Sequence, residues 1–430
     1  MAAGKRVLIL NRWSDETFTR FAEYIDHRQH AVMYITTARA KQAVPADEAA
    51  GVYVLDNLDD AALVTDCARR AARAAGGIDV VIGLAEADLE LAAHIRQELG
   101  VAGNTPRIAR LHRDKVEMKR RLAQVGVRTP RFISCESEPQ VVAFARAVGL
   151  PVMLKPRKGL ASRGTYKIES ERHLLETLRG IDLLHYECEE FVQGQVLHAD
   201  GLVWRGSLAM FKPFKYLGSC YDFAVGKPVG CVTLDDAPLA ARMRTFTEQV
   251  LRGLEHANGA FHLEFFRDDD DNLVFCELGA RIGGAEIPYL FRDVFGVVLA
   301  RECTRIELGE WDPTELIEQQ AIAGGLLLPP PPNAPCRVVR CELRGGGLPT
   351  LYAQMLRRPG DIIDCAGGYN ASSISGMLLF RGRSTAQVER DIVAAVEHFE
   401  IASEAIAAGA STVTARWSWQ PTVNTAAARS

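Results

Sequence analysis

The sequence has little excess charge and no long apolar run. Its 430 residues carry a formal net charge of −4, which argues against a surface devoted to nucleic acid or to an anionic membrane. No stretch is apolar over a length that spans a bilayer. The first apolar run, Val7–Leu10, ends at Asn11 and Arg12 and is interpreted as a β-strand rather than a signal peptide. We therefore expect a soluble, cytoplasmic protein with neither nucleic acid nor membrane as a partner.

Two cofactor patterns are also missing. The ten cysteines are scattered and contain no CxxC pair, which is typical of reduced thiols and not of a zinc module or a disulfide framework. No GxGxxG follows the first strand, so a dinucleotide site is not supported. We assign no catalytic role to any cysteine.

What is present first is an alternation of strand and helix patterns over residues 1–104. This spacing predicts an α/β fold with a parallel sheet and helices on both of its faces. The expected strands are Val7–Leu10, Val32–Thr36, Val52–Leu55 and Val80–Leu84, and the expected helices are Asp15–His27, Ala61–Ala75 and Glu86–Leu99.

The rest of the chain mixes both patterns less regularly. We expect helices at Arg113–Gln124, Pro139–Ala147, Leu239–Asn258 and Thr385–Ala408, the last stopped by Gly409. Expected strands are Val152–Pro156, Thr165–Ile168, His185–Val192, Leu202–Met210, Arg337–Leu343 and Met377–Arg381, with glycine turns at Gly345–Gly347 and Gly367–Gly368. Residues 212–232 are interpreted as a mobile loop, Pro329–Pro332 as a linker and the residues from about Ser411 as disordered.

Two glutamates in a predicted hairpin are the most informative feature. Ala260–Phe266 and Leu273–Glu277 are expected strands, and a turn centred on Asp270–Asp271 places Glu264 opposite Glu277. Their Cβ atoms would then be ~5 Å apart, and the two charges would repel by roughly 3 kcal/mol at an effective dielectric of 20. Such a pair calls for a cation, a shared proton or an arginine. The alternative is a solvated hairpin with two exposed glutamates.

The loop after the second glutamate, Leu278–Gly284, supplies Arg281 and open backbone. Carboxylates, an arginine and glycines together suggest magnesium and phosphate.

Two lysines lie where they can meet phosphate. Lys155 ends a strand before a glycine-containing turn, in which Ser162, Arg163 and Gly164 can complete a phosphate cradle. Lys115 starts a helix, where the positive helix end reinforces its charge. Taken singly, both lysines are equally compatible with ordinary solvated surface.

A strand end at Glu189 and Glu190 leads through Val192 into Gly194. Its backbone can pair with a purine ring, and a carboxylate or Gln195 can take the ribose hydroxyls. The alternative is an acidic edge that discourages aggregation.

The order of these features resembles the ATP-grasp superfamily over roughly residues 80–300. The strings that carry the resemblance are Gly83–Glu86 through Arg113–Lys115 and Gly126–Pro130, Glu190–Gly194 with His198–Gly201, and His262–Glu264 with Glu277–Gly284. The last string is most similar to the carboxylate–amine ligases of the L-amino-acid ligase (dipeptide synthetase) group. Biotin carboxylase is a more distant relative.

The resemblance implies a role for each of these residues. Lys115 and Lys155 match the lysines that touch nucleotide phosphates, and residues 157–164, with Ser162, Arg163 and Gly164, match the loop that covers them. Glu189, Glu190 and Val192 match the adenine hinge, with Gln195 near the ribose. Glu264 and Glu277 match the magnesium ligands, Arg281 with Lys155 the catalytic cations, and Arg281, Gly283 and Gly284 the substrate loop.

The resemblance also implies an organisation and an activity. We expect a Rossmann-like domain over residues 1–110, an ATP-grasp domain over 111–325 with a lid at about 150–210, a C-terminal lobe over 326–412 and a tail over 413–430. The implied enzyme uses ATP with Mg2+ or Mn2+ to join a small carboxylate, such as an amino acid, to an amine through an acyl phosphate. A homodimer is common among such ligases.

The chain departs from the family at Gly279, where an asparagine metal ligand is frequent, and at Leu160 and Ala161, where relatives carry more glycine. His262 lies opposite Gly279 in the predicted register and either replaces that ligand or is a packed histidine. Two rival functions stay open, a bicarbonate-activating carboxylase and a non-catalytic ATP-binding regulator. Three arginines of the C-terminal lobe either bind a substrate carboxylate or lie solvated on a strand. They are Arg337, Arg340 and Arg344.

Overall fold

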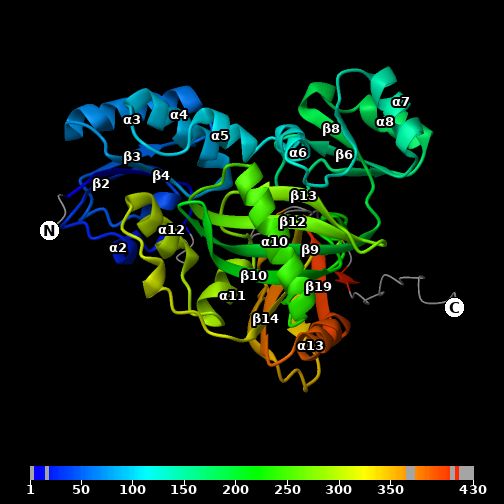
Figure 1. The fold of residues 1–430 in the computed structure, drawn as a ribbon. Coiled ribbons are helices and arrows are strands. Elements are labelled where there is room, and N and C mark those ends of the chain that lie inside the picture. Colours follow the sequence, from blue (N-terminus) through cyan, green and yellow to red (C-terminus); the bar gives the residue numbers. More distant parts are fainter. Residues whose placement is uncertain (1–3, 15–18, 365–372, 407–411, 416–430) are drawn as a thin grey trace.

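The computed structural model describes residues 4–14, 19–364, 373–406 and 412–415. The strands of the described residues form four β-sheets. In Figure 1 an N-terminal lobe and a second small lobe lie above one large central sheet. No helix in these residues has the length and apolarity needed to cross a membrane. The nine cysteines that they contain are all free thiols.

The N-terminal lobe contains a parallel sheet, as predicted, and its strand order is β3-β2-β1-β4. Its strands are β1 (Arg6–Asn11), β2 (Ala31–Thr37), β3 (Gly51–Leu55) and β4 (Val80–Gly83). Helix α3 (Ala61–Ala75) begins where the Asp60 carboxylate accepts the Leu63 N–H, and it ends at Gly76 with a φ of 70°. The other helices are α2 (Phe21–Tyr24), η1 (Ala40–Ala43), η2 (Glu86–Asp88), α4 (Leu89–Leu99) and α5 (Pro106–Leu111).

Helices cover both faces of this sheet, but one of them comes from far along the chain. On one face Leu8 and Leu10 pack with α3 and α4. On the other face Val7 and Ile9 share a core with α2 and with α12 (Leu299–Leu308). The N-terminal lobe is therefore completed by a segment that follows the glutamate hairpin.

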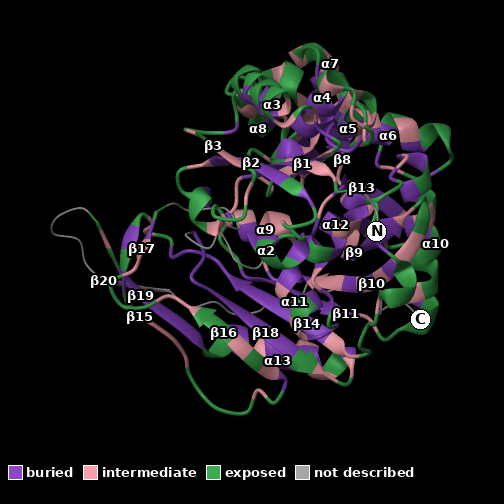
Figure 2. Cartoon of the chain, turned by 90° about the vertical axis from the view of Figure 1, so that its left-hand side faces the viewer, coloured by how far each residue is buried: buried purple, intermediate pink, exposed green. Residues whose placement is uncertain are grey.

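The central sheet has eight strands in the order β13-β12-β9-β10-β11-β14-β18-β16. Figure 2 shows that most of its residues are buried. Its strands are β9 (Gly194–Trp204), β10 (Ser207–Leu217), β11 (Val229–Thr233), β12 (Gly259–Asp268), β13 (Leu273–Gly279), β14 (Ile322–Leu328), β16 (Leu351–Leu356) and β18 (Gly376–Gly382). Its associated helices are α9 (Cys220–Ala224), α10 (Ala237–Gly253), α11 (Ile287–Asp293) and η4 (Pro313–Glu315).

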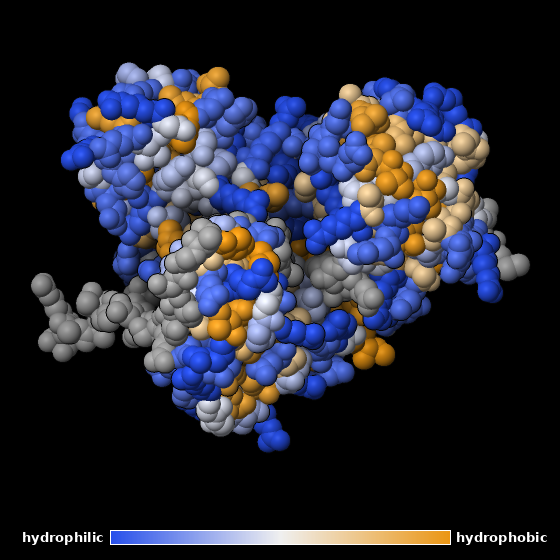
Figure 3. All heavy atoms as spheres, turned by 180° about the vertical axis from the view of Figure 1, so that it is seen from behind, coloured by the Kyte–Doolittle hydropathy of each residue, from blue (hydrophilic) through white to orange (hydrophobic). Residues whose placement is uncertain are grey.

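A separate small sheet in the order β5-β8-β6-β7 has a core of its own, and we call the segment that contains it, Phe132–Glu190, the lid. It comprises β5 (Phe132–Ser134), α7 (Glu138–Val148), β6 (Val152–Pro156), β7 (Tyr166–Ile168), α8 (Glu171–Leu178), η3 (Leu183–His185) and β8 (Tyr186–Glu190). Helix α6 (Lys115–Gln124) links it to the N-terminal lobe. In Figure 3 the molecule is hollowed between the two upper lobes, and the residues in that hollow are largely hydrophilic.

The last part of the chain forms a fourth sheet in the order β17-β15-β19-β20. Its elements are β15 (Cys336–Leu343), β17 (Ile362–Ile363), α13 (Thr385–His398), β19 (Phe399–Ala405) and β20 (Thr412–Ala415). Strands β14, β16 and β18 extend the central sheet instead. The residues after Pro329–Pro332 therefore form one sheet of their own and also add β16 and β18 to the central sheet.

Two predictions for the middle of the chain are wrong. The single strand expected at Leu202–Met210 spans the end of β9 and the start of β10, which turn at Arg205 and Gly206, both with positive φ. Residues 212–232, expected as a mobile loop, hold the rest of β10, α9 and most of β11. The pairing of β10 with β11 begins at Phe214, directly after Pro213, which explains how a proline fits a central strand.

Three helix predictions are too long, and the one expected at Leu239–Asn258 is α10, which ends at Gly253. The C-terminal helix ends at His398, and Phe399–Ala405 instead pairs with β15, because sheet contacts override the helix preference of its alanines and glutamates. Of the helix expected at Asp15–His27, the structure has α2 at Phe21–Tyr24, and residues 15–18 lie outside the described residues. The turn at Gly367–Gly368, the stop at Gly409 and the tail after Ala415 also lie outside them.

Candidate active site

The two glutamates of the hairpin face each other as the register predicted. Glu264 on β12 is the partner of Glu277 on β13. A bulge between Glu264 and Phe265 shifts the register by one residue nearer the turn, where Phe265 pairs with Phe275. The turn itself joins Asp268 to Leu273, so the pairing of the glutamates depends on the bulge as well as on the turn.

A third strand extends this face. His198 on β9 lies opposite Glu264, and Asp200 lies opposite His262. Since residues two apart on a strand share a face, His198, Asp200, His262, Glu264 and Glu277 form one polar surface on the central sheet.

Glu264 is held at one oxygen. Its Oε1 accepts the Tyr216 hydroxyl at 2.9 Å, the Cys220 thiol at 3.4 Å and the His262 Nε2–H at 3.4 Å. Burial raises the pKa of the Glu264 carboxyl, but the hydrogen bonds from His262 and Tyr216 and the imidazolium charge outweigh it and lower the pKa to about 2. The group is therefore a carboxylate at neutral pH.

Glu277 is compensated by a lysine. Lys115 is the first residue of α6, whose Asp114 cap accepts the N–H groups of Val116 and Glu117. The Nζ atom of Lys115 lies 2.7 Å from Glu277 Oε1 and 3.5 Å from the carbonyl oxygen of Gly159. The repulsion expected between the two glutamates is thus offset by a separate cation at each, Lys115 and His262.

Lys155 belongs to a buried network of four charges. It pairs with Glu189, and Lys119 pairs with Glu189 and, at 2.6 Å, with Glu187. The opposed charges outweigh burial, raising the pKa of Lys119 and lowering that of Glu189 to about 2. Lys155 Nζ also lies 3.9 Å from Cys276 Sγ on β13, which connects the lid to the hairpin.

Residues 157–164 form an exposed loop next to these lysines, which we call the phosphate loop. Ser162 and Gly164 have φ values of 54° and 68°, and a Cβ at Gly164 would lie 2.8 Å from the Tyr186 hydroxyl. Arg163 is exposed. Lys158 of this loop pairs with Glu90 of the N-terminal lobe at 2.7 Å. The loop is thus tied to the N-terminal lobe beside Lys115.

The predicted adenine hinge follows β8. Glu189 points inward to the lysines, whereas the next carboxylate, Glu190, pairs with Arg131 on the other face of the strand. Val192 and Gln195 are half-buried. The strand alternation therefore separates the two glutamates that the sequence placed together.

Arg281 is anchored by the N-terminal lobe. Its Nε donates to Glu86 Oε2 at 2.8 Å, and Arg113 pairs with the other oxygen of Glu86. A Cβ at Gly279 would lie 3.3 Å from the Arg281 guanidinium carbon, so the missing side chain leaves room for Arg281. In the same loop Gly283 is buried and Gly284 exposed.

His262 is neither a free metal ligand in place of the missing asparagine nor simply a packed histidine. His262 donates Nδ1–H to Asp200 at 2.9 Å and faces Glu264 with Nε2, so both nitrogens face carboxylates. Burial lowers the pKa of this imidazole, but the carboxylates of Asp200 and Glu264 outweigh burial and raise it to about 10. His262 is therefore a charged, hydrogen-bonded residue of the site.

The C-terminal arginines lie apart from this cluster. Arg340 and Arg344 pair with Glu400 on β19, and Arg337 donates to the Gly360 carbonyl at 3.3 Å. This arrangement agrees with the alternative of a strand surface rather than a substrate site.

Several residues of the site were missed. Lys119 is one helical turn from Lys115 and Glu187 is two residues from Glu189, so helix and strand periodicity could have found both. His198 and Asp200 follow the same two-residue period. Glu86 lies in the string Gly83–Glu86, but nothing in that string indicates its partner Arg281, which is 195 residues away.

Two comparisons with known proteins found similar proteins, whereas no protein-family model matches the chain. The L-arginine-specific L-amino acid ligase of Bacillus subtilis is 21% identical over 302 residues, which cover 68% of this chain and 73% of that enzyme. The L-amino acid ligase of Bacillus licheniformis has a similar structure, with a TM-score of 0.72 and 17% identity over 93% of this chain and 99% of its own.

A more distant structure is the biotin carboxylase domain of the 2-oxoglutarate carboxylase of Hydrogenobacter thermophilus, in complex with MgADP and bicarbonate. Its TM-score is 0.64 at 16% identity, over 96% of this chain and 92% of that one. The predicted ATP-grasp fold is confirmed, and so is the resemblance to the L-amino-acid ligase group.

Proposed function

We propose that this ATP-grasp protein is an ATP-dependent carboxylate–amine ligase, which joins an amino acid or another small carboxylate to an amine and releases ADP and phosphate. One observation carries the proposal. Contacts connect Glu264 and Glu277 of the central sheet with Lys115 of α6 and Lys155 of the lid. Arg281, from the loop after β13, is held by Glu86 and interacts electrostatically with Glu277.

The reaction has two steps. The γ-phosphoryl group of ATP is transferred to a carboxylate oxygen, giving an acyl phosphate and ADP. The amine then attacks the acyl carbon, phosphate leaves, and the amine loses a proton. Such transfers depend mainly on positioning and charge neutralisation, and neither step requires a protein nucleophile.

The donor set fits a hard divalent cation. Glu264 and Glu277 offer carboxylate oxygens from facing strands, the ligands that Mg2+ and Mn2+ prefer. When bound there, the ion would neutralise phosphate charge. We assign both glutamates as its ligands.

The cations have separate tasks in this proposal. Lys115 and Lys155 bind the phosphate oxygens of the nucleotide, covered by Ser162, Arg163 and Gly164 of the phosphate loop. Arg281 binds the phosphoryl group in transfer, and Gly283 and Gly284 bring open backbone to the substrate. Excluding water by loop closure protects the acyl phosphate from hydrolysis.

The adenine and ribose are assigned to the strand end that follows Lys155 and Glu189. The backbone at Glu190 and Val192 faces the purine ring, with Glu189 beside it, and Gln195 contacts the ribose. The proposal favours the ligase over a bicarbonate-activating carboxylase because the L-arginine-specific ligase is similar in sequence along most of this chain.

The test is ADP release from MgATP with a panel of amino acids, with products identified by mass spectrometry. A ligase shows an amino-acid-dependent rate and a condensed product. Glu264→Gln and Glu277→Gln should each lower that rate by about 100-fold or more, since metal binding contributes several kcal/mol. Glu248→Gln, at a half-buried position of α10 where Glu248 pairs with Arg244, is the matched control. Tight ATP binding without turnover would instead support a regulator.

A further inference from the structure

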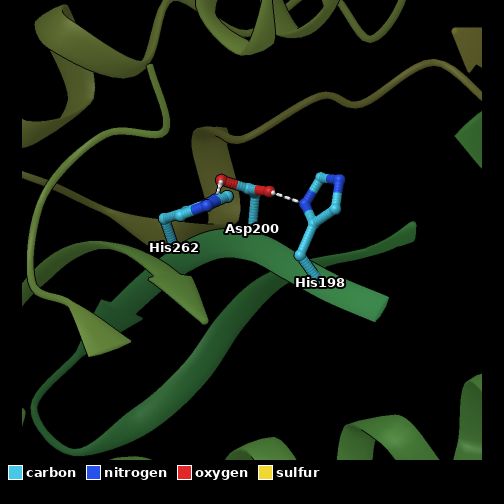
Figure 4. A group of neighbouring side chains, drawn as sticks. All are labelled: His198, Asp200 and His262. Carbon is cyan, nitrogen blue, oxygen red and sulfur yellow. Dashed lines mark hydrogen bonds and ion pairs between the residues drawn. The ribbon is translucent and has the colours of Figure 1, made fainter. Parts of the chain in front are cut away.

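A chain of hydrogen bonds that runs through Asp200 and two histidines ends at Glu264. Asp200 lies between two imidazoles, accepting Nδ1–H of His198 at 2.8 Å on one oxygen and Nδ1–H of His262 at 2.9 Å on the other (Figure 4). We call these three residues the His–Asp–His bridge. Both distances are those of hydrogen bonds, and each oxygen of the carboxylate is used by a different ring.

The bridge is rigidly held. His198 and Asp200 have no exposed surface. The His198 ring stacks on Phe214 with centroids 4.6 Å apart and an interplanar angle of 7°, and it lies 4.4 Å from the Tyr216 ring. Rotation of this imidazole would disrupt the packed core, so Asp200 has a fixed partner on the side away from His262.

The other end of the bridge reaches Glu264. His262 directs its second nitrogen at Glu264 Oε1, the oxygen that also accepts from Tyr216 and Cys220. Within the residues that the structure describes, no donor contacts Oε2. One oxygen is therefore held by the protein and the other is presented to a ligand.

Asp200 also contacts the substrate loop. A Cβ at Gly283 would lie 2.4 Å from Asp200 Oδ1, so the loop backbone packs directly on this carboxylate. A single buried side chain thus lies against both His262 and the loop that carries Arg281.

We propose that the His–Asp–His bridge positions Glu264 for the metal–nucleotide complex. Asp200 fixes the ring plane of His262, and His262 fixes the carboxylate of Glu264 so that Oε2 faces the divalent cation. The bridge residues are positioning residues, since none of them touches substrate in this arrangement. The inference rests on the proposed function, because it takes Glu264 as a metal ligand.

The test uses the nearly isosteric change Asp200→Asn and measures metal binding directly. Manganese is titrated into the full-length protein saturated with ADP by isothermal titration calorimetry. An amide cannot accept from both imidazoles, so His262 loses its fixed orientation, and we expect Mn2+ to bind 10–100-fold more weakly, the usual effect of losing an outer-shell partner. The affinity for ADP without metal should not change.

The matched control is Asp391→Asn. Asp391 lies on helix α13 and is also buried. Its carboxylate accepts two hydrogen bonds from Thr350, one from the backbone N–H at 2.8 Å and one from the hydroxyl at 2.6 Å. It should lose a similar amount of thermal stability and keep its Mn2+ affinity. If Asp200→Asn does not fold, His262→Phe removes the Nε2 donor and carries the same test.

Two further variants separate the possible failures. Glu264→Gln with unchanged Mn2+ affinity would remove Glu264 from the metal site, and the proposed function would lose its main ligand. If Glu264→Gln binds Mn2+ more weakly and Asp200→Asn binds it as the parent does, only the positioning role of the bridge is overturned. If Asp200 acts through Glu264, the double variant binds Mn2+ no more weakly than Glu264→Gln alone.

Discussion

The buried charge network under the phosphate loop gives the sharpest stability prediction. Lys119, Lys155, Glu187 and Glu189 are two cations and two anions, and the side chains of Lys119 and Glu187 have no exposed surface. Replacing Lys119 by methionine keeps the length of the side chain and removes one positive charge. The network then holds two buried carboxylates against a single lysine.

The expected cost follows from leaving a buried charge without its partner. Breaking such a pair by removing one member typically costs about 3–5 kcal/mol, so Lys119→Met should lose that amount in urea unfolding. The double variant Lys119→Met with Glu187→Leu removes one charge of each sign and should recover most of the loss. Arg146→Ala breaks the exposed pair with Glu171 in the same lid and should leave the free energy of unfolding nearly unchanged, because solvent screens that pair.

The refuting results are specific. A Lys119→Met protein within about 1 kcal/mol of the parent would mean that the remaining charges are solvated or neutralised. A double variant as unstable as the single one would show that packing of Lys119, rather than charge balance, sets its contribution.

Three other predictions concern activity and pH. Glu86→Gln should lower kcat by about 100-fold with little change in the KM for ATP, because Arg281 loses its anchor, and steady-state ADP release measures both. Gly279→Asn should lower the same rate rather than supply a ligand, because its Cβ would press on the Arg281 guanidinium. Stability should fall as the pH drops from about 7.5 to 5. Burial lowers the pKa of His112 to about 4 and that of His256 to about 3, below the ~6.5 of a histidine in the unfolded chain. Over this pH range these two imidazoles therefore bind protons only in the unfolded chain, which lowers the free energy of unfolding by about 2 kcal/mol for each of them.

Each of these has an opposing outcome. An unchanged kcat in Glu86→Gln would show that Arg281 keeps its position without the N-terminal lobe. A faster Gly279→Asn enzyme would mean that the introduced asparagine supplies a metal ligand in this site. A free energy of unfolding in urea that is the same at pH 5 and pH 7.5, both for the parent and for His256→Asn, would mean that the two imidazoles are in contact with water.

The sequence was sufficient where the physical signal is local. The parallel sheet follows from short apolar strands at regular spacing. The pairing of Glu264 with Glu277 was predicted from the turn alone, although in the structure a bulge next to Glu264 also sets it. The extent of the helix at Thr385–Ala408 was not predictable in this way, because Phe399–Ala405 becomes a strand only through pairing with β15. Strand β10 was hidden by Pro213, which is tolerated because its pairing with β11 starts one residue later.

The candidate site divides along the same line. Lys115, Lys155 and Arg281 lie in recognisable strings, whereas their partners are set by tertiary structure. Nothing within the string that holds Glu86 indicates that it meets Arg281. Likewise the bridge at His198 and Asp200 becomes visible only when β9 is placed beside β12.

Helix α12 has a consequence for how this protein can be recombined. It packs against the side of β1 that carries Val7 and Ile9, in one core with Ile306 of the helix itself. Grafting the first hundred or so residues from a related ligase would therefore bring in a sheet shaped for a foreign helix. Exchange between relatives should succeed only when the helix travels with the lobe, so these two distant segments are expected to change together in evolution.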